Sequence, residues 1–221
     1  MCLAVPGEAL EAEGNVVREA CLDVVPGAGA GDYHLVHLGF GVRHTDAEQG
    51  LRFFTEPEFN QSPIFVDTGS FEAERATLYN LEASWRGGPF WLMGEYFRQD
   101  VDAPSLGNPI FGGYYLSANW ILTGQMRPYN RRSAIIDRVP ISQSVTQGGI
   151  GSWEVAIRWS SLDLTDGAIE GGEMDIFSLG VNWWLTGTFM FGVNYRHIEL
   201  DRFGVRGSSD GANVRLLLVL E

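Results

Sequence analysis

Lysine is absent from this sequence, and all fifteen basic residues are arginine. Because 28 residues are acidic, the formal net charge is −13, and no stretch gathers enough positive charge to bind a nucleic-acid backbone. The chain has only two cysteines, Cys2 and Cys21, and their spacing matches no metal site. We therefore expect no nucleic-acid partner, no metal site and no cofactor.

Long apolar runs are also missing. Hydrophobic residues make up 45% of the chain, yet no run approaches the ~20 apolar residues that a membrane helix needs. The amino terminus lacks the basic and apolar regions of a secretory signal peptide. Residues 1–31 are only weakly patterned, so we separate this amino-terminal segment from residues 32–221, which carry a regular pattern.

That pattern is an alternation of apolar and polar residues, seen most clearly between residues 151 and 201. Side chains on a strand alternate between two faces, so Trp153, Val155, Ile157 and Trp159 share an apolar face opposite Glu154 and Arg158. The same alternation predicts eight strands: 32–44, 75–86, 89–100, 112–124, 151–164, 172–185, 188–201 and 211–221. An apolar outer face with a polar inner face is typical of a transmembrane antiparallel β-barrel.

The connections between these strands differ in length. Gly87-Gly88 and Thr186-Gly187 predict tight hairpins at one end of the barrel. We expect longer loops at the other end, over 45–72, 101–111, 164–172 and 202–210. The long connection 125–150 is an exception, because it lies at the end with the tight turns.

Arginines are the candidate anion-binding and pore-lining residues. Those on the polar face of the predicted strands are Arg43, Arg86, Arg158, Arg196 and Arg215. Arginine on the lipid side would cost roughly 2–4 kcal/mol, and a guanidinium suits phosphate oxygens. Two interpretations remain open: these arginines guide anions, or they form salt bridges with Glu82, Glu95 and Glu154. A second set, Arg127, Arg131, Arg132 and Arg138, is either an anion attractor folded into the pore or a solvated loop.

Catalytic chemistry has little support. No serine lies in a nucleophile elbow, which argues against a hydrolase. His34 and His37 fall on opposite faces of one predicted strand, so joint metal ligation is not expected. The acids between residues 163 and 173 do not match the spacing of a calcium-binding loop. We expect a protein that is not an enzyme.

Several stretches together resemble the phosphate-selective porin family, in order along residues 33–221. They are LVHLGFGVR (35–43), Asp67-Thr68-Gly69, GGPFWLMGEYF (87–97), ILTGQ followed by Arg127 and Tyr129 (121–129), GSWEVAIRWSSLDL (151–164) and LGVNWWL (179–185). This resemblance implies a sixteen-stranded outer-membrane barrel, usually a homotrimer, in which basic side chains of the lumen select anions. The chain resembles the carboxy-terminal half of such a barrel, and we expect it to be a piece of a longer protein.

The resulting functional hypothesis is passive diffusion of anions, such as phosphate or polyphosphate, across the bacterial outer membrane. A second hypothesis is a small barrel with a structural or adhesive role, because eight strands alone enclose a lumen filled by side chains. A soluble ligand-binding barrel is a third, but it would expose a large apolar face to water.

Overall fold

The computed structural model describes residues 22–24, 33–44, 50–59, 62–130 and 135–219. Side chains are described from residue 50 onward, apart from those of Asn130 and Ile135. Within this part of the chain the fold is all-β, and its helices are two single 3₁₀ turns, Pro104–Leu106 and Val145–Gln147. Neither helix is long and apolar enough to span a membrane.

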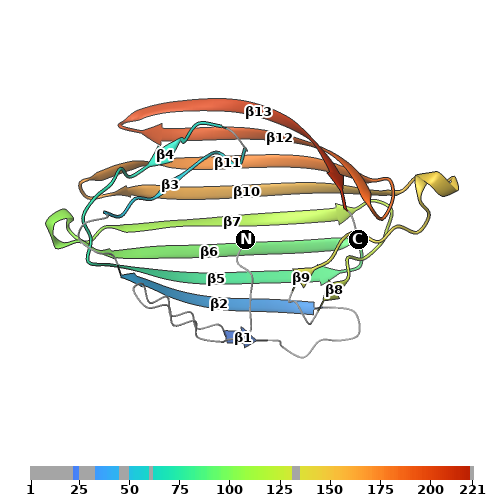
Figure 1. The fold of residues 1–221 in the computed structure, drawn as a ribbon, viewed down its shortest axis with the longest axis horizontal. Coiled ribbons are helices and arrows are strands. Elements are labelled where there is room, and N and C mark those ends of the chain that lie inside the picture. The colour runs from blue at the N-terminus through green and yellow to red at the C-terminus, as the bar shows by residue number, and fades with distance from the viewer. Residues whose placement is uncertain (1–21, 25–32, 45–49, 60–61, 131–134, 220–221) are drawn as a thin grey trace.

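One antiparallel sheet of nine strands dominates the structure (Figure 1), and each long strand pairs with the next long strand along the chain. The strand order is β1 (Leu22–Val24), β2 (Tyr33–His44), β5 (Arg75–Gly87), β6 (Phe90–Asp102), β7 (Ile110–Ile121), β10 (Ser152–Asp166), β11 (Ile169–Trp184), β12 (Phe189–Arg202) and β13 (Val205–Leu218). The eight predicted strands are confirmed as β2, β5, β6, β7, β10, β11, β12 and β13, and β1 adds a short strand within the segment where none was predicted. The sheet is open, with β1 and β13 at its edges, as expected of part of a larger barrel.

The register gives the sheet an apolar face that carries large exposed side chains. Leu116 pairs with Trp159 on the neighbouring strand, Trp159 pairs with Phe177, and their exposed fractions are 64%, 54% and 46%. The band continues on both sides, through Tyr96 and Leu81 and through Leu179, Val193 and Leu216. Nothing in the described part of the chain covers this apolar face.

Two long connections pack onto the opposite, polar face at opposite ends of β10. Residues 50–74 contain a small hairpin, β3 (Phe54–Thr55) and β4 (Val66–Asp67), and bury Leu51 and Val66 in a core with Leu164. We call residues 50–74 the inner loop; Figure 1 shows β3 and β4 beside β10 and β11. Residues 122–151, here called the long turn, include β8 (Tyr129–Asn130) and β9 (Ile135–Ile136) and bury Val139 against Trp184.

Three of the loops predicted at the end opposite the tight turns are shorter than expected. The hairpin between β10 and β11 turns at Gly167-Ala168, and the one between β12 and β13 turns at Phe203-Gly204. The predicted loops 164–172 and 202–210 were therefore wrong, because the strands continue through polar residues such as Glu170 and Ser208 beyond the apolar band. Loop 101–111 shrinks to residues 103–109.

Candidate functional site

The middle of the polar face, between the two packed connections, holds the candidate site. Its floor is a row across three strands, in which Ser178 of β11 pairs with Arg158 of β10 on one side and with Arg196 of β12 on the other. Strand pairing places side chains that are directly opposite about 5 Å apart, so the two arginines flank a single serine. We call Arg158, Ser178 and Arg196 the arginine row.

The inner loop brings a carboxylate onto this row. Arg158 Nε donates a hydrogen bond of 3.1 Å to Glu58 Oε1, and Ser160 Oγ donates one of 2.9 Å to the same oxygen. Arg196 Nε lies 3.8 Å from Glu58 Oε2. One carboxylate thus lies against two guanidinium groups from strands that are not adjacent.

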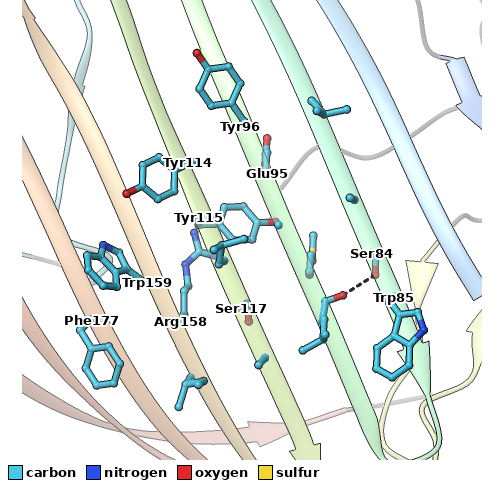
Figure 2. Close-up of a pocket in the computed structure, with 18 residues that line it drawn as sticks. Ser84, Trp85, Glu95, Tyr96, Tyr114, Tyr115, Ser117, Arg158, Trp159 and Phe177 are labelled. Carbon is cyan, nitrogen blue, oxygen red and sulfur yellow. Dashed lines mark hydrogen bonds between the residues drawn. The ribbon is translucent and has the colours of Figure 1, made fainter.

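Aromatic rings fix both guanidinium groups. The Arg158 guanidinium carbon lies 3.7 Å from the centre of the Tyr115 ring, and Figure 2 shows these two side chains together between β7 and β10. The guanidinium of Arg196 lies 4.6 Å from the Phe59 ring centre, and its Nη1 donates a 2.7 Å hydrogen bond to Asn213 Oδ1. Such stacking reduces the motion of a long side chain and orients its donors.

The backbone at the tip of the inner loop is strained. Glu58 has a φ of 57°, a left-handed conformation that costs a non-glycine residue about 1–2 kcal/mol. The adjoining Phe59 lies directly over Gly211, where a Cβ would come within 2.2 Å of the ring. The close approach of ring and backbone explains why glycine stands at this position of β13.

The base of the inner loop is held by an ion pair and by hydrogen bonds to its backbone, outside the strands that would span a membrane. Arg52 donates to both oxygens of Asp67 at 2.8 and 2.7 Å, and this hydrogen bonding lowers the pKa of Asp67 to about 2. Arg202 Nη2 reaches the backbone carbonyl oxygen of Asp67 at 2.8 Å. The loop is therefore tied to β12 as well as to itself.

A cavity of about 780 Å³ lies between the inner loop and the sheet. Its lining includes Arg158, Tyr115 and Ser160 from the sheet, and it also carries four carboxylates: Glu56, Glu58, Glu82 and Glu95. The lining therefore carries more acidic than basic groups, with four carboxylates against Arg158, and Arg196 of the row adds only one further positive charge. Figure 2 shows Glu95 near Tyr115. The residues drawn there line a second hollow of about 730 Å³, whose walls include Trp85, Tyr96 and Trp159 of the apolar face.

A buried ion pair fastens the long turn to the sheet. Glu154 is 1% exposed, and its carboxylate accepts hydrogen bonds from Arg127 Nη2 at 2.6 and 2.8 Å and from Asn182 Nδ2 at 3.1 Å. Arg86, also buried, donates to the backbone carbonyl oxygen of Arg127. The long turn is thus folded onto the polar face.

The structure distributes the predicted arginines among different roles. Arg158 and Arg196 come together at the row, Arg86 and Arg127 hold the long turn, and Arg138 Nη1 binds the carbonyl oxygen of Gly187 at 3.0 Å. Arg215 is exposed on the edge strand, without a hydrogen-bond or ion-pair partner among the described residues. Arg131, Arg132 and the side chain of Arg43 lie outside the described residues, as do Cys2 and Cys21.

The sequence interpretation missed Glu58, Ser160 and Asn213. Salt bridges to Glu82, Glu95 and Glu154 were one of the two open interpretations of the strand arginines, and Glu154 forms a salt bridge with Arg127 of the long turn. Nothing in the pattern of residues 45–72 indicated that Glu58 would reach β10 and β12, about a hundred residues further along the chain. Within the described part, no three acidic, histidine or cysteine side chains gather as metal ligands.

Comparison with known protein families decides the classification. The model of the phosphate-selective porin O and P family matches residues 31–218. The chain belongs to this family. A second family model, HupF/HypC, matches residues 1–54 and so overlaps the porin match at residues 31–54.

Two relatives are similar to the porin part of the chain. An uncharacterized protein of Caulobacter vibrioides is 29% identical over 167 residues, which cover 72% of this chain and 33% of that protein. Porin O of Pseudomonas aeruginosa is 26% identical over 155 residues, which cover 65% of this chain and 34% of that protein. The chain spans about a third of the length of the curated relatives that it matches.

Proposed function

We propose that this chain forms part of the wall and inner constriction of a bacterial outer-membrane porin, through which anions such as phosphate or polyphosphate diffuse passively. Membership of the phosphate-selective porin O and P family supports this function, and the name of Porin O of Pseudomonas aeruginosa agrees with it. The exposed apolar face suits lipid, whereas in water it would be an aggregation-prone surface. We also propose that the whole protein is a homotrimer and not an enzyme, with residues 32–221 as barrel and residues 1–31 as a separate segment.

The main support for anion binding is the position of the Glu58 carboxylate, which contacts the arginine row. A site that holds one oxyanion between Arg158 and Arg196, with Ser160 as an added donor, has the donors that a permeating oxyanion needs. Arg196 Nε and Ser178 Oγ, on paired positions of the row, are buried and have no hydrogen-bond partner among the described residues. A pore requires such sites to bind weakly enough for release.

Single-channel recording of the full-length protein, purified from outer membranes, tests this function. In Arg158→Ala and Arg196→Ala, we expect the phosphate concentration that half-blocks chloride current to rise about tenfold, since a charge-assisted hydrogen bond contributes about 1.5–3 kcal/mol. Arg75→Ala is the control, because Arg75 is exposed and pairs with Asp102 away from the row. Unchanged block in both row variants would contradict the assignment.

The structural barrel remains the alternative, and one observation favours it. Arg86, Arg127 and Arg138 bind protein acceptors and fasten the long turn, as side chains that only strengthen a wall would do. Absence of current from a correctly folded protein would support this alternative over the porin.

A further inference from the structure

The position of Glu58 on the arginine row has a functional consequence of its own. Its carboxylate occupies the donors of Arg158 and Ser160 and lies close to Arg196. These are the groups that a permeating anion would have to use. In this arrangement the site is filled by the protein's own carboxylate.

The rest of the inner loop is anchored independently of this carboxylate. Val66 is completely buried, and Asp67 is held by Arg52 and by Arg202 through its backbone oxygen. By contrast, the Glu58 side chain remains 28% exposed beside the cavity of about 780 Å³. Rotation of this one side chain into the cavity therefore frees the row without unfolding the loop.

We propose that Glu58 is a tethered competitor for the anion-binding row, displaced by a tetrahedral oxyanion of the phosphate class. A phosphate ion offers more acceptor oxygens than a carboxylate, so in place of Glu58 it would accept hydrogen bonds from Arg158, Arg196 and Ser160 together. In the absence of such an anion, Glu58 returns, neutralises the row and weakens its attraction for chloride. This inference rests on the proposed anion-porin function.

The test compares Glu58→Gln with Glu56→Gln in the full-length protein in planar bilayers. Both residues line the same cavity, but Glu56 makes no ion pair with a described arginine, so the two substitutions remove equal charge from the cavity. Inorganic phosphate is titrated against chloride current, and both variants are first checked for heat-modifiable migration as a sign of a folded barrel. If Glu58 leaves the row free for about a tenth of the time, its removal lowers the half-blocking phosphate concentration about tenfold.

A drop of this size in Glu58→Gln, with Glu56→Gln within about twofold of the wild type, supports the proposal. Equal changes in both variants indicate a general charge effect and overturn it, as does no change in Glu58→Gln when the wild type is blocked by phosphate. If the wild type itself passes no anions, the proposed porin function is wrong, and so is the competitor role that rests on it.

Discussion

The ion pair between Glu154 and Arg127 offers a quantitative test of how the long turn is held. Glu154 is 1% exposed and its partner 13%, so Glu154→Gln leaves a guanidinium with little access to water. Breaking one side of a buried pair costs about 3–5 kcal/mol, and we take the lower end because Arg127 keeps some exposure. We therefore expect the turn to open with a free energy about 3 kcal/mol lower than in the wild type.

Limited trypsin digestion measures this opening. The bond after Arg138 lies next to the buried Val139, so cleavage there requires the turn to detach from the sheet. When opening is a rapid pre-equilibrium, a 3 kcal/mol change raises the cleavage rate about a hundredfold. Mass spectrometry of the fragments identifies the site.

Two variants serve as controls. Glu170→Gln removes an exposed carboxylate from β11 and is expected to leave the cleavage rate unchanged. The double variant Arg127→Met/Glu154→Met removes both charges, so we expect slower cleavage than in Glu154→Gln alone. A cleavage rate in Glu154→Gln within twofold of the wild type would show that this pair does not fasten the turn.

Two further predictions concern the two faces and the inner loop. Leu116→Arg places a charge in the middle of the apolar face, so we expect it to destabilise the inserted barrel by about 2–4 kcal/mol and to impair insertion into lipid vesicles. The adjacent Ser117→Arg, on the polar face, is expected to insert normally. Gel migration of unheated samples distinguishes the two variants, and equal insertion would contradict the assignment of the faces. The pKa of Asp67 lies at about 2, below its ordinary value of 3.8, so the stabilisation of the inner loop by Asp67 is complete above pH 3.8 and is lost as the pH falls through about 2. A less stable inner loop would move more within the pore and so increase the noise of the single-channel current. We expect this noise to stay constant between pH 7 and 4 and to rise below about pH 3. A rise already at pH 5 would contradict the role of Asp67 in holding the loop.

The strands and their faces were predictable from residue order alone. Alternation between residues 151 and 201 located β10, β11 and β12, because one face of each strand is apolar and period two is enough to define it. Alternation failed where polar residues occupy both faces. The segment 205–210, VRGSSD, reads as a loop, yet it pairs with residues 197–202 of β12.

The candidate site was only half predictable. Arg158 and Arg196 follow from strand parity, and their common neighbour Ser178 follows once the register is known. Glu58 does not, because its contact with β10 depends on how a loop folds back across about a hundred residues of sequence. One of the two open interpretations paired Glu154 with a strand arginine, but its partner is Arg127 of the long turn.

Selection of anions by the arginine row can be measured as the reversal potential of the full-length wild-type protein in a potassium chloride gradient. If the row governs the pore, the reversal potential lies near the chloride equilibrium potential, and inorganic phosphate reduces the current. A reversal potential near that of potassium, with no effect of phosphate, would show instead that the acids of the cavity govern the pore, and an anion porin would be excluded.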